Sequence, residues 1–416
     1  MAKLSEILRE RGYVYQHSSE KLEEITDGAK RTVYLGVDPT ADSMHVGHLT
    51  GMLVLRRFLE DGHKVILLTG GGTGMIGDPG GKSEERNLLD AETLAANAEA
   101  VSKQMRKVFG TDDIIEENNL AWLGELRLLD FLRDIGKHFT VNAMIKKDIV
   151  SERLKKESPI SFTEFSYALL QGYDFLHLNE KYGCDVQVGG SDQWSNILTG
   201  VEFIRKKTEQ TVYAFTWPLV VDKATGKKFG KSEQGTVWLD AAKTSPFQFY
   251  QFWLNTTDDA LGELLLKMTM LEKAEIDAAL ELHARDKRER HGQKLLAREA
   301  TTLVHGEAEA VRAEQVSLVL FGEAALSSLD AEMLDTLKRA APSYETKGGA
   351  AIVDILVGAG LASSKREARQ FLADKAVSLN EREIDESYVV APEDFHQGVA
   401  LLKRGARHVC VLVYTE

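Results

Sequence analysis

The sequence predicts an α/β protein whose first part is a doubly wound parallel sheet, followed by a helical region and a smaller α+β region. Three observations carry this prediction. Short apolar, β-rich runs alternate with stretches of helical periodicity in the first half of the chain. Helical patterns then dominate from about 245 to 340. After a stretch rich in Pro, Ser and Gly, short helix and strand patterns return.

The first elements follow from hydrophobic periodicity. RTVYLGVD (31–38) is a short β-rich run. From His45 onward apolar residues recur at spacings of three and four, which predicts a helix that Gly62 ends. KVILLT (64–69) is the nearly continuous apolar run expected of a buried parallel strand. A glycine-rich loop follows, and residues 91–109 form the pattern of an amphipathic helix.

The remaining elements complete the organisation of the chain. Residues 162–180 predict another helix, and CDVQVGGSDQW (184–194) predicts a strand, a Gly-Gly turn and a further helix. We expect four segments. They are a Rossmann-like domain at residues 1–222, a loop with a helical domain at 223–340, a linker at 341–348 and a C-terminal domain at 349–416.

Composition limits the class of protein. The 416 residues suggest two or three domains at roughly 150 residues each, and the net charge is −13. No apolar run is long enough to span a membrane, and the charged N-terminus lacks the apolar segment of a secretory signal. Two cysteines, Cys184 and Cys410, exclude a disulfide framework and a cysteine-rich zinc site. We therefore expect a cytoplasmic protein with no membrane partner and no structural metal.

The glycines after the second strand resemble a dinucleotide-binding fingerprint. Gly72, Gly74 and Gly77 spell G-x-G-x-x-G. However, Asp78-Pro79 follows at once where the fingerprint needs a helix. These glycines are better explained by a loop around another polar ligand, and an NAD-linked oxidoreductase stays the weaker alternative.

The segment Asp38-Pro39-Thr40 and then HVGH (45–48) lies where a strand ends and a helix begins. The first turn of a helix offers free N–H groups and a positive dipole end to phosphate. His45 and His48 share a helix face, and Gly47 lets a flat group approach the backbone. This favours nucleotide binding. Helix capping or a metal pair remain alternatives, although a third metal ligand is not evident.

The segment KKFGKS (227–232) places lysines on a loop with glycines at Gly226 and Gly230. Such lysines can close over a pyrophosphate and neutralise charge in a transition state. The alternative is an ordinary solvated basic turn. HxGH with KFGKS about 180 residues later is much more specific than either motif alone.

Together these motifs resemble those of the class I aminoacyl-tRNA synthetases, with HVGH for HIGH and KFGKS for KMSKS. Further stretches narrow the resemblance to the bacterial-type tyrosyl-tRNA synthetases and extend it over essentially the whole chain. They are YLGVDPTADSMHVGHL (34–49), GMIGDPGGKSEER (74–86), SFTEFSYALLQGYDF (161–175), QVGGSDQW (187–194) and KKFGKSEQGTVWLD (227–240).

A tyrosine pocket is consistent with these residues. Tyr34 and Asp174 can hydrogen-bond a phenol, and Asp174 shares a helix face with Tyr167 and Gln171. Ordinary packing beside solvent is the alternative for that face. A site that hydrogen-bonds the hydroxyl rejects phenylalanine by leaving buried polar groups unpaired. The resemblance implies that the tyrosine ammonium and carboxylate are held by Asp78, Tyr167, Gln171 and Gln193.

The resemblance also implies a site for ATP, with Mg²⁺ as part of the substrate complex. It places Thr40, His45, Lys228 and Lys231 on the phosphates, and His48, Gly190 and Asp192 on the ribose. Lys82 and Arg86 would assist the pyrophosphate or the tRNA end. Further ATP contacts are expected at Gly36, Asp38, Gly47 and Ser232. Leu35 and Gly51 depart from the family, because polar side chains that contact the ribose often stand there.

The mechanism implied needs no covalent enzyme intermediate and no general base. The tyrosine carboxylate attacks the α-phosphate of MgATP, and the tyrosyl-adenylate then gives tyrosine to the 3′ end of tRNA(Tyr). Two alternatives stay open, the NAD-linked oxidoreductase and a non-catalytic RNA-binding protein.

The C-terminal segment 349–416 resembles an S4-type RNA-binding fold, and the helical region would contact the anticodon stem. Its candidate RNA contacts are Lys365, Arg366, Arg369, Lys403, Arg404 and Arg407. Residues 346–416 hold nine Lys or Arg against ten Asp or Glu, so only local clustering makes this segment basic. A solvated charged surface is the alternative. The resemblance further implies a homodimer with Phe162 at its interface.

Overall fold

The computed structural model describes residues 2–79, 89–221, 229–232, 235–405 and 408–415, excluding the side chains of residues 148, 149, 231 and 232. The chain forms two compact units. Unit 1 comprises residues 1–243 and 257–287, and unit 2 comprises residues 244–256 and 288–416.

Unit 1 is built on a six-stranded sheet in the order β1-β6-β5-β2-β3-β4. All neighbouring pairs are parallel except β1 with β6. The strands are β1 (Gln16–His17), β2 (Thr32–Val37), β3 (Lys64–Thr69), β4 (Ile115–Asn118), β5 (Val186–Gly190) and β6 (Tyr213–Trp217). The chain proceeds outward in one direction through β3 and β4 and in the other through β5 and β6. The expected doubly wound sheet is therefore confirmed, with its switch point between β2 and β5.

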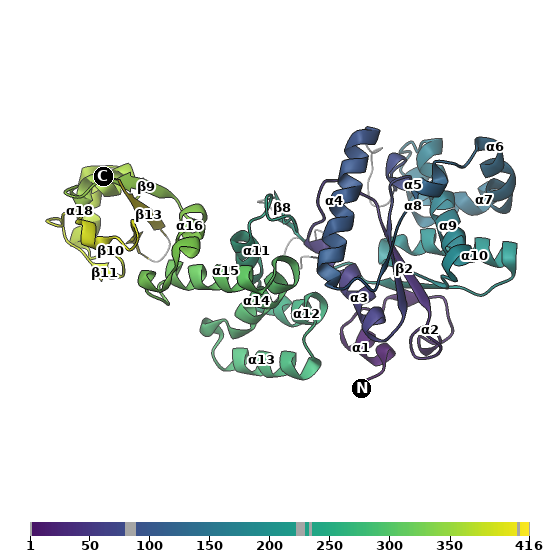
Figure 1. Cartoon of the computed structure of the whole chain (residues 1–416), viewed down its shortest axis with the longest axis horizontal. Coiled ribbons are helices and arrows are strands. Elements are labelled where there is room, and N and C mark those ends of the chain that lie inside the picture. The colour runs from purple at the N-terminus through teal and green to yellow at the C-terminus, as the bar shows by residue number, and fades with distance from the viewer. Residues whose placement is uncertain (1, 80–88, 222–228, 233–234, 406–407, 416) are drawn as a thin grey trace. The chain divides into compact units, whose positions relative to one another are not determined.

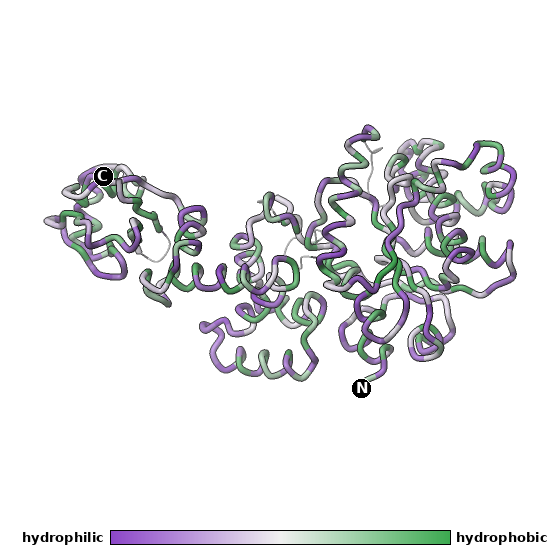
Figure 2. The backbone as a smooth tube through the Cα atoms, in the orientation of Figure 1, coloured by the Kyte–Doolittle hydropathy of each residue, from purple (hydrophilic) through white to green (hydrophobic). Residues whose placement is uncertain are grey.

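Helices cover this sheet because each presents an apolar stripe to it. Helix α3 packs against β2 and β3, α4 against β3, and α10 against β5 and β6, while α9 packs on α10. The buried strand residues are mainly Val, Ile and Leu, and the hydrophobic colour in Figure 2 follows the central strands. The helices of unit 1 are α1 (Leu4–Glu10), α2 (Glu23–Thr26), α3 (Leu49–Glu60), α4 (Ala91–Phe109), α5 (Leu120–Leu123), α6 (Leu128–Asp130), α7 (Val141–Ile145), α8 (Asp148–Lys155), α9 (Phe162–Tyr182), α10 (Trp194–Thr208), α12 (Asp258–Met268) and α13 (Lys273–Arg285).

Local signals explain where the main helices begin and end. The hydroxyl of Ser161 accepts from the Glu164 amide and begins α9, and Gly183 ends it in a left-handed conformation. Asp90 and Gly110 do the same for α4, whose bounds match the expected 91–109. The helix expected from His45 instead starts as a 3-10 turn, η1 (Val46–His48), before α3.

Unit 2 holds a helical part and a five-stranded sheet in the order β11-β10-β12-β13-β9. Its elements are α11 (Pro246–Leu254), α14 (His291–His305), α15 (Glu307–Leu320), α16 (Ala331–Ala340), β9 (Ser343–Thr346), α17 (Ile352–Gly358), α18 (Lys365–Ala373), β10 (Val377–Leu379), β11 (Arg382–Glu383), β12 (Val399–Arg404) and β13 (His408–Tyr414). Helices α17 and α18 pack with this sheet around one apolar core. Figure 1 shows these C-terminal elements in yellow.

Two expected boundaries differ from these elements. Residues 341–348, expected as a linker, include β9, which pairs in parallel with β13 and so belongs to the C-terminal sheet. Helices α12 and α13, expected in the helical domain, belong to unit 1. The guanidinium of Arg11 explains this, because it donates to the carbonyls of Leu266 and Thr269 at the end of α12. In the described part of the chain, no helix combines the length and apolar character required to cross a bilayer.

Candidate active site

A cavity of about 600 Å³ opens at the carboxyl edge of the parallel strands. Residues from β2, β5 and β6 line it, together with the loops that follow β2 and β3 and with parts of α3 and α9. It lies at the switch point between β2 and β5, where open α/β sheets bind ligands. The expected site residues that line it are Tyr34, Gly36, Asp38, Thr40, His45, Gly47, His48, Asp78, Tyr167, Gln171, Asp174, Gly190, Asp192 and Gln193.

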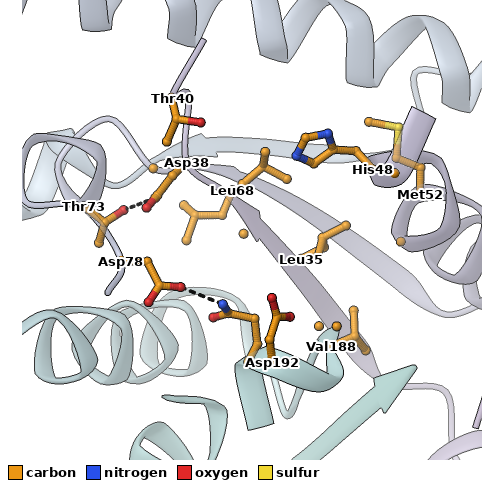
Figure 3. A pocket seen from close by; sticks show the side chains of 18 of the residues that line it. Leu35, Asp38, Thr40, His48, Met52, Leu68, Thr73, Asp78, Val188 and Asp192 are labelled. Carbon is orange, nitrogen blue, oxygen red and sulfur yellow. Dashed lines mark hydrogen bonds between the residues drawn. The ribbon is translucent and has the colours of Figure 1, made fainter. Parts of the chain in front are cut away.

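The cavity has two chemically different sides, which neighbouring residues of β2 separate. Tyr34 faces α9, where its ring lies 5.3 Å from that of Phe175, whereas the next residue, Leu35, faces α3. We call them the α9 side (Tyr34, Asp38, Thr73, Asp78, Asn119, Tyr167, Gln171, Asp174 and Gln187) and the α3 side (Leu35, His45, Gly47, His48, Gly51, Met52 and Trp217). Figure 3 shows carboxylates of the first group opposite the imidazole and aliphatic side chains of the second.

Asp174 is the buried carboxyl group at the base of the α9 side. Its Oδ2 accepts from Asn119 Nδ2 at 2.9 Å, and its Oδ1 accepts from Trp122 Nε1 at 2.7 Å. Burial raises the pKa of Asp174 to about 7, although both hydrogen bonds oppose this shift by stabilising the carboxylate. The group is thus a strong acceptor whose charge depends on pH near neutrality.

A chain of hydrogen bonds holds Asp174 relative to the rest of the α9 side. The second hydrogen of Asn119 Nδ2 goes to Thr73 Oγ1 at 2.9 Å, and Thr73 donates to Asp38 Oδ1 at 2.7 Å. The hydroxyl of Tyr167 donates to Asp38 Oδ2 at 2.7 Å. These contacts join the polar side chains of the α9 side into one network, which preorganises them.

Three buried polar atoms on this side lack a hydrogen-bond partner among the described residues. They are the hydroxyl of Tyr34, Oε1 of Gln171 and Oε1 of Gln187. Burial also keeps Tyr34 neutral by raising the pKa of its phenol well above the ordinary value. Because leaving buried polar atoms unpaired is costly, their convergence on one cavity points to a polar ligand.

Asp78 and Gln193 meet at the mouth of the α9 side. Nε2 of Gln193 donates to Asp78 Oδ2 at 2.6 Å, which fixes the orientation of the amide. Asp78 follows the loop after β3, and Gln193 ends the 3-10 turn η5 (Ser191–Gln193) after β5. Residues from two different loops therefore combine at the strand ends.

On the α3 side, the two histidines of HVGH order the turn that begins α3. Nδ1 of His45 accepts from the Gly47 amide at 3.0 Å, and Nδ1 of His48 accepts from the His45 amide at 3.1 Å. The two histidines therefore cap the start of this turn, which is one of the alternatives given for them in the sequence analysis. It leaves Nε2 of each neutral ring as the proton-bearing nitrogen, which can donate to an anionic ligand.

The HVGH and KFGKS motifs are adjacent in space. The amide of Val46 donates to the carbonyl of Val237, and that of Leu239 donates to Met44. A Cβ on Gly230 would lie 2.3 Å from a methyl carbon of Val46, so Gly230 is required for this approach. Lys231 and Ser232 form β7, which pairs with β8 (Gly235–Thr236). Lys82, Arg86 and Lys228 lie outside the described residues.

The candidate RNA contacts lie in unit 2. Lys365 pairs with Asp354 at 2.5 Å, and Arg369 pairs with Glu386 at 2.7 Å; both are largely exposed, as is Arg366. The guanidinium of Arg404 lies over the ring of Phe371. Arg407 lies outside the described residues.

Lys403 differs from these cations. Its side chain is only 9% exposed and pairs with Glu381 at 2.5 Å. Because the charge is buried and already compensated, we assign Lys403 a structural role rather than the expected RNA contact.

Sequence reasoning missed four residues that line or support the α9 side. Thr73, Asn119 and Gln187 follow or belong to parallel strands, and Trp122 belongs to α5. A polar residue at a strand's carboxyl end, or a lone glutamine within an apolar strand, was an available signal. Nothing in the spacing predicted that Trp122 donates to Asp174.

Comparison with known proteins decides the family. Residues 26–322 match the model of class I tRNA synthetases (W and Y), and residues 332–412 match the tyrosine–tRNA ligase SYY-like C-terminal domain. The chain is 45% identical to a tyrosine–tRNA ligase of Roseiflexus castenholzii over 98% of both chains.

The chain belongs to the tyrosine–tRNA ligase family of class I tRNA synthetases. It is therefore an enzyme, an aminoacyl-tRNA ligase, and the oxidoreductase and the non-catalytic RNA-binding protein are set aside.

Solved structures agree with this assignment. The fold resembles a C-terminally truncated mitochondrial tyrosyl-tRNA synthetase of Aspergillus nidulans, with a TM-score of 0.70 and 31% identity over 77% of this chain and 95% of that one. The corresponding Coccidioides posadasii structure gives a TM-score of 0.66 and 29% identity over 76% and 92%.

Proposed function

We propose that this ligase activates L-tyrosine with MgATP in the cavity of unit 1 and transfers it to tRNA(Tyr). The observation that carries the proposal is the convergence of unpaired polar atoms with Asp174 on the α9 side. The substrate phenol donates to Asp174 and accepts from Tyr34, which pairs both groups. Asp78, Tyr167 and Gln171 hold the ammonium, and Gln193 lies beside the carboxylate.

The α3 side takes ATP. Thr40 and His45, with Lys228 and Lys231 of the KFGKS segment, bind the phosphates, and His48, Gly190 and Asp192 face the ribose. Gly36, Gly47 and Ser232 complete the nucleotide site together with Asp38 of the α9 side. Lys82 and Arg86 assist the pyrophosphate or the tRNA end. The metal ion enters with ATP as part of the substrate. Catalysis is then the positioning of the carboxylate against the α-phosphate and the neutralisation of charge on the leaving pyrophosphate.

Amino-acid-dependent ATP–pyrophosphate exchange tests this proposal directly. We expect exchange with tyrosine and at least a thousandfold less with phenylalanine, because phenylalanine leaves Tyr34 and Asp174 unpaired. Exchange with no amino acid, or equal exchange with phenylalanine, would contradict it.

For tRNA, we propose that the exposed cations Lys365, Arg366 and Arg369, together with the half-buried Arg404, contact phosphates. Support comes from their clustering on α18 and the end of β12. Replacing Arg366 and Arg369 together with alanine should raise the KM for tRNA while pyrophosphate exchange is retained.

We also propose that two copies associate through the apolar surface of α5–α9. Its exposed side chains include Leu128, Leu129, Val141 and Phe162, of which Phe162 is 73% exposed. Figure 1 places α5 to α8 together at one end of unit 1. An exposed apolar area of this kind is typical of subunit interfaces. Light scattering should give a dimer, and Phe162→Asp should shift it toward the monomer.

A cytoplasmic location fits the same proposal. Cys184 and Cys410 are both buried, unpaired thiols, as expected in a reducing compartment.

A further inference from the structure

Gly51, the third residue of α3, has no room for a side chain. A Cβ built on it would lie 2.7 Å from Cζ2 and 3.0 Å from Cη2 of Trp217, and 3.4 Å from Cδ2 of Leu35. Cβ contacts below 3.0 Å are essentially absent from real proteins. The backbone of Gly51 does not have a positive φ, so this glycine is required by the neighbouring indole rather than by its own conformation.

The contact lies in the wall of the cavity. Trp217 ends β6 beside Gly190 of β5, and it is only 6% exposed. Leu35 of β2 and Met52 of α3 complete this wall and are also buried. All four residues line the cavity, and Figure 3 shows Leu35 and Met52 near His48, opposite the carboxylates.

This wall consists of apolar and aromatic surface, from Leu35, Met52 and Trp217. An indole edge and a leucine methyl offer a nucleoside contact area, not directional hydrogen bonds.

We infer that Gly51 and Trp217 are a size-matched pair that shapes the nucleoside part of the cavity and so determines affinity for ATP. This inference rests on the proposed function, because it assigns the α3 side to ATP. The pair works as a unit: Trp217 needs a glycine at 51, and a side chain at 51 needs a smaller residue at 217.

If a side chain is introduced at position 51, the indole of Trp217 can move more easily than helix α3. The α3 residues Met52, Leu53 and Val54 are completely buried, so the helix is held in the core. Trp217 stands at a strand end beside open cavity. A methyl group at position 51 therefore pushes the indole into the nucleotide site and leaves the α9 side unchanged.

A double-mutant cycle tests the pair, with KM for ATP and for tyrosine measured by pyrophosphate exchange. Gly51→Ala should raise the KM for ATP at least tenfold while changing that for tyrosine less than twofold. Trp217→Leu should raise the KM for ATP only a few-fold. In the double variant, Gly51→Ala should add less than a twofold effect, because the clash is gone.

Gly262→Ala in α12 is the matched control, because a Cβ there meets only Cδ1 of Leu280 in α13, at an ordinary 3.6 Å. If Gly51→Ala is soluble but inactive, tyrosine binding by calorimetry provides the second readout, and intact tyrosine binding supports the inference.

Three outcomes overturn the inference: an unchanged KM for ATP in Gly51→Ala, equal losses for tyrosine and ATP, or single effects that simply multiply in the double variant. If the unmodified enzyme gives no tyrosine-dependent exchange, the proposed function fails instead. The two failures are therefore distinguishable.

Discussion

The α9 and α3 sides of the cavity share strand β2 but achieve binding by different means. On the α9 side, side chains are hydrogen-bonded to one another, from Asp38 through Thr73 and Asn119 to Asp174. On the α3 side, the wall is shaped by backbone hydrogen bonds, by the two histidine side chains that cap the turn before α3, by close-packed glycines and by apolar surface.

This difference indicates how each side of the cavity can distinguish a correct ligand from a wrong one. A locked polar network makes a wrong ligand costly, because an unmet donor or acceptor stays buried. A wall of apolar surface and backbone fits by shape, and one misplaced methyl group alters it. Substitutions should therefore affect the two substrates separately, according to the side on which they fall.

We expect Asp174→Ala to produce the largest difference between the effects on tyrosine and on ATP. The change removes the acceptor of the phenol and leaves Asn119 Nδ2 and Trp122 Nε1 without their partner. Because the buried phenol then lacks its acceptor in the transition state, kcat/KM for tyrosine should fall about a thousandfold, whereas the unpaired Asn119 and Trp122 lower stability. Steady-state exchange kinetics measure this, with the exposed Asp113→Ala as control. A loss below tenfold would contradict the role of Asp174.

Lys231→Ala should have the next largest effect, from the opposite side. Its backbone lies in β7, beside the segment that pairs with HVGH. Loss of one cation at the leaving pyrophosphate should slow adenylate formation about a hundredfold and spare tyrosine affinity. Pre-steady-state adenylate formation and equilibrium tyrosine binding separate the two effects. Lys273→Ala on α13 is the control, and equal losses in both measurements would exclude the assigned role.

Asn119→Ala tests whether the hydrogen-bond network of the α9 side contributes to the use of tyrosine. Asp174 would keep its bond from Trp122 but lose the one from Asn119, and the Gly72 amide would lose its acceptor. We expect kcat/KM for tyrosine to fall about tenfold and the KM for ATP to stay within twofold. Asn142→Ala, at an exposed position, provides the comparison. Equal changes for both substrates would show that Asn119 supports the whole cavity.

The smallest effect is a pH dependence confined to the α9 side. Because the pKa of Asp174 is about 7, its carboxylate is lost as pH falls below that value. The KM for tyrosine should then rise at most about tenfold for each pH unit, while the KM for ATP follows no such profile. A flat tyrosine profile between pH 6 and pH 8 would exclude this titration.

The carboxyl group of Asp174 also predicts how stability depends on pH. Here the direction is opposite, because stability falls as pH rises. Its pKa is raised above that of the unfolded chain, so the folded state binds the proton more tightly. The free energy of unfolding should therefore fall as pH rises from about 4 to about 7 and then level off with respect to this group. Thermal melting of Asp174→Asn against the unmodified chain isolates that contribution.

The sequence alone determined the elements whose information is local. The bounds of β3 and α4 match their predicted ranges, because apolar spacing, an N-cap such as Asp90 and a C-terminal Gly110 are all encoded within a few residues. HVGH and KFGKS likewise identified the family from residue types at fixed spacing.

Only the tertiary structure decided what depends on burial and on contacts between distant residues. Asn119 and Trp122 reach Asp174 across more than fifty positions, and no periodicity encodes that meeting. Lys403 belongs to a basic cluster in the sequence, yet folding buries it against Glu381. The sequence shows that Gly51 departs from the family pattern but not why. The structure explains it, because the indole of Trp217 fills the space that a side chain at position 51 would need. Such facts depend on which side chains share space, and only packing settles that.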